Sequence, residues 1–66
     1  GFAKVLADPD TRLLLGAHIV GPQAPTLIQQ LIQGIAVGLT VDRMAHDQLY
    51  IHPAMPELVE QALLDL

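Results

Sequence analysis

The sequence predicts an α+β fold, in which an antiparallel β-hairpin, part of a larger sheet, is followed by an amphipathic helix, a short helix, an irregular loop and a C-terminal helix. Two observations lead to this order. Strand-like segments flank a turn before Gly21, and from Ala24 onward apolar residues recur at helical spacing. No internal repeat or low-complexity segment interrupts the pattern.

The hairpin is predicted from strands at residues 2–7 and 12–20, joined by the turn-forming run Asp8-Pro9-Asp10-Thr11. Both faces of the second strand are largely apolar, which predicts that both are covered. A lone hairpin is marginally stable in water, so at least one further strand is expected. No third strand is visible downstream, and we expect it upstream of this chain.

The first helix shows the clearest amphipathic pattern in the chain. Pro25 suits its first turn and Gly38 its C-terminal end. Its glutamines lie opposite an apolar stripe that comprises Leu27, Ile28, Leu31, Ile32, Ile35 and Ala36.

Two shorter helices are predicted after Gly38. Thr40 can cap a helix at about 41–45, and Pro56 can open a last helix that ends near Leu64. The stretch between them, residues 46–55, has no regular periodicity and is predicted to be a loop.

Composition indicates a chain that needs a partner surface. With 66 residues it forms at most one small domain, and without cysteine it has no disulfide, thiolate metal site or thiol nucleophile. Hydrophobic residues make up 52% and charged residues only 15%, too apolar for disorder or for a small monomer. The chain also opens inside a strand-like segment at Gly1. We therefore expect a fragment whose apolar surface is covered by a partner subunit or by the rest of a longer chain.

Charge and hydropathy exclude several partners. The net charge of −4 repels nucleic acid and anionic lipid, and no basic cluster overrides it. No apolar run approaches the length of a membrane span, and no signal peptide is visible. These features predict a cytoplasmic protein without nucleic-acid or membrane partners.

The candidate site is the segment from His52 to Glu57. Pro53 disfavours helical geometry at His52, while Pro56 places Glu57 in the first turn of a helix, where a carboxylate is favoured. The short excursion between the prolines can fold His52 back onto Glu57. A carboxylate on one imidazole nitrogen fixes the tautomer and leaves the other nitrogen free to exchange a proton. This would be the base and orienting partner of a triad, without its nucleophile.

Simpler interpretations of the same residues remain open. A histidine beside a proline in a loop is often only a loop residue, and Glu57 could be a solvated first-turn acid. His18 is expected to be a packed or edge residue of a strand, and His46 a charge at a helix end. The three histidines lack metal-ligand spacing, so no metal site is predicted. No phosphate-binding glycine loop is present.

Four segments match a known family in order and spacing. They are Gly1-Phe2-Ala3-Lys4, the run from Leu15 to Ala24, Leu39-Thr40-Val41, and Ile51-His52-Pro53 with Glu57. Across essentially all 66 residues the chain resembles the C-terminal dimerisation domain of the pyridine nucleotide–disulfide oxidoreductases. Dihydrolipoamide dehydrogenase, glutathione reductase, mercuric reductase and mycothione reductase belong to this family.

The resemblance implies a role for each residue of the loop. His52 would act across a homodimer as acid/base in thiol–disulfide exchange, and Glu57 would orient it. Backbone at Tyr50, Ile51, His52 and Pro53 would approach the flavin of the partner subunit, and the His52–Pro53 peptide would be cis.

The rest of the machinery would lie upstream. The resemblance implies FAD and NAD(P)H as cofactors of the complete enzyme, bound by domains that this chain lacks, and a C-x-x-x-x-C redox pair. Residues 1–66 alone would be the C-terminal portion of the dimerisation domain, inactive and without bound cofactor. The substrate would be a small-molecule disulfide or dithiol, and the process cell redox homeostasis.

The loop also distinguishes branches of the family. Tyr50 stands where many dihydrolipoamide dehydrogenases carry a second histidine, and Ala54-Met55-Pro56 replaces their Thr-Leu-Ser. The pattern is closer to mycothione reductase. Two alternatives remain: a noncatalytic dimerisation module, and a related flavin-dependent oxidoreductase such as a transhydrogenase or metal-ion reductase. The upstream sequence would discriminate between them.

Overall fold

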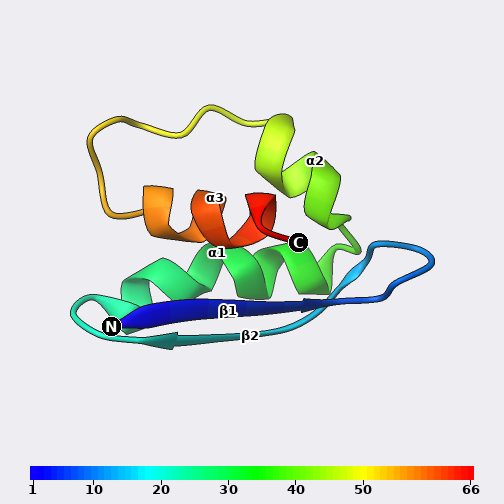
Figure 1. The fold of residues 1–66 in the computed structure, drawn as a ribbon, viewed down its shortest axis with the longest axis horizontal. Coiled ribbons are helices and arrows are strands. Elements are labelled where there is room, and N and C mark those ends of the chain that lie inside the picture. The colour runs from blue at the N-terminus through cyan, green and yellow to red at the C-terminus, as the bar shows by residue number, and fades with distance from the viewer.

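A two-stranded antiparallel sheet carries three helices on one of its faces (Figure 1). The computed structural model describes all residues, 1–66. The elements are β1 (Phe2–Ala7), β2 (Leu14–Val20), α1 (Ala24–Ala36), α2 (Val41–His46) and α3 (Glu57–Leu64). α1 packs on β2, α3 packs on β1, and α2 packs on α3. The predicted α+β class and order of elements are confirmed.

The second strand begins later than predicted, at Leu14 rather than Arg12. Arg12 has a φ of 66°, a left-handed conformation that cannot continue a strand. The turn before it is closed by the Asp8 carboxylate, which accepts the backbone N–H groups of Asp10 at 2.8 Å and Thr11 at 2.9 Å. The tight turn therefore extends two residues into the segment that the sequence pattern assigned to the strand.

A bulge at Leu15 changes which residues of β2 face the helices. Gly16 pairs with Leu6 but Leu14 pairs with Ala7, so one extra residue stands between them. In a regular strand, Leu14 and Gly16 would lie on the same face, because side chains alternate with a period of two. In the structure Leu14 is buried with Val5 in the core, because the bulge turns it to the helical side.

Only one face of the hairpin is covered by the helices. The opposite face leaves large apolar side chains partly open: Phe2 (53% exposed), Leu6 (43%), Leu15 (62%) and Val20 (54%). The expected cover on both faces and the upstream third strand therefore stay predictions.

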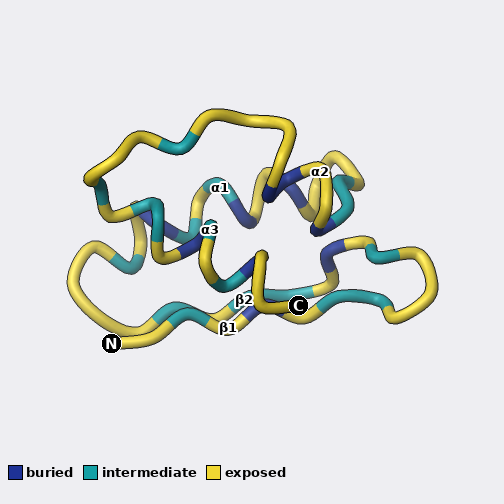
Figure 2. Tube along the Cα trace, turned by 45° about the horizontal axis from the view of Figure 1, so that its top comes forward, coloured by how far each residue is buried: buried dark blue, intermediate teal, exposed yellow.

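The core lies between the sheet and the helices, where the buried stretches face one another (Figure 2). From α1, the residues that enter it are Leu27, Leu31 and Gly34. The predicted stripe of α1 is wider than this buried face, since Ile32 is 48% and Ile35 37% exposed. The nine core residues are Val5, Leu14, Leu27, Leu31, Val41, Met44, Ala45, Val59 and Leu63.

Local signals end and start the helices as predicted. Gly38 has a φ of 73°, and Leu39 N–H donates to Gly34 O at 2.9 Å, the αL termination typical of glycine. Thr40 Oγ1 accepts the N–H of Arg43 at 3.1 Å and caps α2, which runs one residue further than predicted.

None of the helices is both long enough and apolar enough to cross a membrane.

Candidate active-site loop

An extended loop joins the end of α2 to the start of α3, passing over the outside of the helices (Figure 1). Within it, no backbone hydrogen bond involves residues 48–53. The loop is held by side chains instead, at its beginning through Gln48 and Tyr50 and at its end through His52 and Glu57.

The structure brings His52 and Glu57 together as the sequence predicted. His52 Nδ1 lies 2.5 Å from Glu57 Oε1. The second oxygen, Oε2, accepts the backbone N–H of Ala54 at 3.1 Å. Glu57 stands in the first turn of α3, and the peptide between His52 and Pro53 is cis, as the resemblance implied. Both carboxylate oxygens are thus engaged with the loop that carries the imidazole.

Each member of the pair favours the charged form of the other. The hydrogen bond that Glu57 accepts from the ring, and then the negative charge of Glu57, raise the pKa of His52, and the charge of Glu60 adds to this. The hydrogen bonds from His52 and from the Ala54 N–H lower the pKa of Glu57. Because an ionised carboxylate only accepts, Nδ1 carries the hydrogen of this bond. His52 Nε2 makes no hydrogen bond, and 79% of the side chain is exposed.

The side chains of Tyr50 and Ile51, which were also predicted site residues, have different surroundings: the first is hydrogen-bonded within the chain and the second is exposed. The Tyr50 hydroxyl donates to Met44 O at 3.0 Å, so the phenol is turned back onto α2. Burial, and then the charge of Glu60, raise the pKa of Tyr50. Ile51 is 64% exposed. Of these two residues, the Ile51 side chain and the backbone remain open to a partner.

Sequence reasoning missed the residues that anchor the loop. Gln48 Nε2 donates to Met44 O at 2.9 Å and to the Tyr50 hydroxyl at 3.2 Å. The Ala54 N–H on Glu57 was also missed. A backbone carbonyl and a backbone amide have no sequence signature. Only the single tyrosine, so close to His52, offered a signal.

The other histidines lie outside this site. His18 is on the exposed face of the hairpin, opposite Lys4, and His46 ends α2. No cluster of three or more histidine, aspartate or glutamate side chains is arranged to hold a metal ion.

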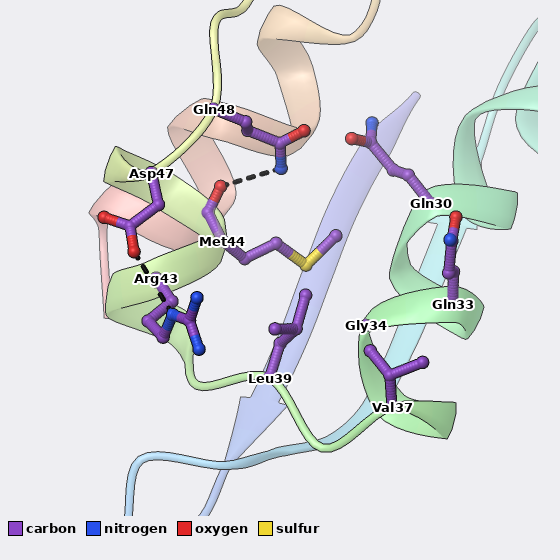
Figure 3. Close-up of a pocket in the computed structure, with 9 residues that line it drawn as sticks. All are labelled: Gln30, Gln33, Gly34, Val37, Leu39, Arg43, Met44, Asp47 and Gln48. Atoms are coloured by element: carbon purple, nitrogen blue, oxygen red, sulfur yellow. Dashed lines mark hydrogen bonds and ion pairs between the residues drawn. The ribbon is translucent and has the colours of Figure 1, made fainter.

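A pocket of about 290 Å³ lies between α1 and α2 (Figure 3). It is separate from the His52–Glu57 pair and shares Asp47 and Gln48 with the beginning of the loop. Arg43 and Asp47 form an ion pair at 3.2 Å on its wall. Its lining residues are Gln30, Gln33, Gly34, Val37, Leu39, Arg43, Met44, Asp47 and Gln48.

The hairpin and the three helices span residues 2–64, and this part of the chain matches a known family of interface domains. Residues 1–63 match the family model described as the pyridine nucleotide-disulphide oxidoreductase dimerisation domain, and the chain belongs to this family. Over all 66 residues it is 53% identical to mycothione reductase of Mycobacterium tuberculosis, of which it spans 14%.

Dihydrolipoyl dehydrogenases are similar at lower identity. The chain is 44% identical over 62 residues to dihydrolipoyl dehydrogenase 2 of Haloarcula marismortui, covering 94% of this chain and 13% of that protein. It is 36% identical over 64 residues to dihydrolipoamide dehydrogenase of Chaetomium thermophilum, covering 97% and 12%. The predicted leaning toward the mycothione reductase pattern agrees with these identities. The chain spans only about a seventh of these relatives, 14% at most.

Proposed function

We propose that this chain is the C-terminal portion of the dimerisation domain of a flavin-dependent NAD(P)H disulfide reductase, and that His52 and Glu57 are its acid/base pair. The observation that carries the proposal is the contact between His52 Nδ1 and Glu57 Oε1, which leaves Nε2 unpartnered on an exposed loop. The family assignment supports the same chemistry.

Thiol–disulfide exchange requires proton transfer at sulfur. The attacking thiol must lose its proton to become a thiolate, and the thiolate that leaves must gain one. Nε2 of His52 can take the first proton and return it to the leaving sulfur, so that no net proton is consumed at the imidazole. Glu57 stabilises the imidazolium between the two transfers and holds the ring in one orientation.

The reacting sulfurs come from outside this chain. It contains no cysteine, so the redox pair would belong to another part of the protein, which we propose is in the second subunit of a homodimer. The exposed apolar side chains of the hairpin and of α1 support such an interface, because obligate interfaces resemble a protein core.

A flavin fits this loop through backbone contacts. The backbone of residues 48–53 makes no backbone hydrogen bond within the chain, and the Ile51 side chain is 64% exposed, whereas the Tyr50 hydroxyl is already engaged. When bound, the flavin would carry electrons from NAD(P)H to the disulfide. We propose that Tyr50, Ile51, His52 and Pro53 border it, and that the domains outside residues 1–66 bind most of both cofactors.

The proposed substrate is a small-molecule disulfide or dithiol, with the disulfide mycothione the first candidate because of the 53% identity to mycothione reductase. The 44% identity to a dihydrolipoyl dehydrogenase makes dihydrolipoamide the second. Turnover of the complete protein on the two substrates decides between them.

The experiment that tests the pair is His52→Ala in the full-length protein, followed by rapid mixing. We expect reoxidation of the reduced enzyme by disulfide to slow by about 100-fold or more, since a positioned acid/base contributes 10²–10⁴-fold. Flavin reduction by NAD(P)H should stay unchanged. His46→Ala, a histidine at the end of α2, is the matched control and should behave like the wild type.

Two results would contradict the proposal. A loss below about threefold in His52→Ala would remove the acid/base role, because it falls well short of general acid–base catalysis. A full-length protein without flavin would leave a noncatalytic dimerisation module, the alternative that the sequence left open.

A further inference from the structure

We propose that Tyr50 is a positioning residue for His52, which acts by anchoring the loop to the last carbonyls of α2. The inference rests on the acid/base role proposed for His52. It concerns the tyrosine side chain, which reaches neither Nε2 nor Glu57 by any hydrogen bond.

The anchor point is the carbonyl of Met44. α2 ends at His46, and the last backbone bond of its C-terminus runs from Asp47 N–H to Arg43 O. The next carbonyl, that of Met44, has no backbone donor, as is usual at a helix end. The Tyr50 hydroxyl fills this position at 3.0 Å and the Gln48 amide at 2.9 Å.

The anchor is rigid because of where Met44 lies. The Met44 side chain is only 3% exposed and belongs to the hydrophobic core. Gln48 Nε2 also donates to the Tyr50 oxygen at 3.2 Å, which closes a triangle of hydrogen bonds between an amide, a phenol and a carbonyl. The loop is thereby fixed to a residue of the hydrophobic core.

Apart from the side chains of Gln48 and Tyr50, no hydrogen bond attaches residues 48–51 to the rest of the molecule. No backbone hydrogen bond involves residues 48–53, and Leu49 is 87% exposed. Tyr50 precedes His52 by two residues, and a chain spans at most about 3.6 Å per residue. The phenol therefore restricts the His52 backbone to within about 7 Å of an anchored Cα, while Glu57 holds the ring from the other side.

Tyr50 is suited to remain a donor. Burial and the charge of Glu60 raise its pKa, so the hydroxyl keeps its proton at neutral pH. In a neutral phenol the donated hydrogen goes to Met44 O and a lone pair accepts from Gln48. Phenylalanine would retain an aromatic ring of the same size and remove both interactions.

The test uses the full-length enzyme with Tyr50→Phe. We expect kcat for disulfide reduction to fall about three- to tenfold, the loss that one misplaced hydrogen-bonded anchor produces. The KM for NAD(P)H and the rate of flavin reduction should stay within about twofold, a change too small to indicate lost binding. The imidazole NMR resonance of His52, read from ¹³C-labelled histidine, should shift or broaden. Gln61→Leu, which removes an amide that donates a hydrogen bond to Asp65 on α3, is the control and should change none of these.

The outcomes separate this inference from the proposed function. If His52→Ala abolishes disulfide reduction but Tyr50→Phe leaves kcat and the His52 resonance unchanged, the positioning role is wrong and the acid/base pair stands. If His52→Ala has no effect, both fail. Should Tyr50→Phe slow flavin reduction as much as disulfide reduction, Tyr50 is merely structural.

Gln48→Leu covers the case in which Tyr50→Phe does not fold. It removes the side-chain amide that donates hydrogen bonds to Met44 O and to the Tyr50 hydroxyl, and it retains the phenol. A loss of kcat smaller than that expected for Tyr50→Phe, with normal flavin reduction, supports the anchoring role of Tyr50. An unchanged kcat overturns this role.

Discussion

His52 and Glu57 are joined Nδ1 to Oε1 at 2.5 Å, and the remaining carboxylate oxygen is held by the backbone of the same loop. Because Ala54 N–H occupies Oε2, the carboxylate cannot rotate without losing a second bond. The imidazole therefore meets a fixed acceptor, and its free nitrogen points away from Glu57. The effect of Glu57 on the pKa of His52 can therefore be measured.

The pKa of His52 should lie above its ordinary value of 6.5. Glu57 accepts a hydrogen bond from the ring and favours the imidazolium, so Glu57→Gln should bring the pKa of His52 back down. A histidine NMR titration of both proteins gives the two values. Equal midpoints in wild type and variant would show that the contact does not persist in solution.

The pH dependence of loop stability follows from the raised pKa of His52 and the lowered pKa of Glu57. The raised pKa of His52 gives stabilisation that is complete below 6.5 and is lost as pH rises through the folded value. The lowered pKa of Glu57 gives stabilisation present above 4.5 and lost as pH falls through its folded value. The pair should thus hold the loop best between pH 4.5 and 6.5. Amide exchange of Ala54 across this range would test it.

Glu57→Gln should lower disulfide turnover less than His52→Ala does. The glutamine still accepts or donates near the ring, and the imidazole remains to transfer the proton, but the imidazolium loses its charged partner. Steady-state kinetics of both variants at one pH make the comparison. A loss equal to or larger than that of His52→Ala would mean that Glu57 itself transfers protons.

The absence of a side chain at Gly34 allows α1 to approach α2 and β2 closely. A Cβ built there would stand 2.7 Å from the Met44 sulfur and 3.0 Å from a Leu14 methyl. Overpacking costs about 1–3 kcal/mol, and alanine regains only about 0.5–1 kcal/mol of helix propensity. Gly34→Ala should therefore lower the unfolding free energy by about 1 kcal/mol net.

A double-mutant cycle identifies the cause. In a background that already carries Met44→Ala, the contact of the added Cβ with the Met44 sulfur is gone and only the Leu14 methyl remains close, so Gly34→Ala should destabilise less than in the wild type. Thermal unfolding of the four proteins gives the coupling. Additive effects would show that the strain lies elsewhere.

The Thr40 cap should stabilise α2 measurably. Its hydroxyl accepts the Arg43 N–H at 3.1 Å, and loss of such a cap costs about 1 kcal/mol. In Thr40→Ala, amide exchange in α2 should accelerate about fivefold, which is what such a loss of local stability implies. Thr26→Ala is the control, because Thr26 lies exposed in the first turn of α1 and its side chain makes no hydrogen bond. Unchanged exchange in Thr40→Ala would contradict the cap.

The features that the sequence predicted correctly are local ones. Thr40 and Gly38 act within a few residues of their own position, so their residue types were sufficient. The pairing of His52 with Glu57 spans only five positions. The pattern of prolines around it was enough to suggest that the imidazole folds back onto the carboxylate.

The features that were missed depend on distant parts of the chain. The bulge at Leu15 is fixed by pairing with β1, and the left-handed Arg12 is tied to α2, where it pairs with Asp42 at 3.0 Å. Neither partner is apparent from the local pattern. The Tyr50 anchor was missed because its acceptor is the backbone of Met44, which any residue would supply.

The exposed apolar side chains predict self-association of the isolated chain. Leu15 on the open face of the hairpin and Ile32 on α1 are 62% and 48% exposed, and each belongs to a group of similar neighbours. Burial of apolar area is favourable by about 25 cal/mol per Å², so such faces should pair in water. Light scattering of residues 1–66 should show dimers or larger species. Leu15→Lys with Ile32→Lys should shift the chain toward monomer, whereas Lys4→Arg, a polar control on the same hairpin face, should not. A wild-type chain that stays monomeric at high micromolar concentration would mean that these faces do not attract one another.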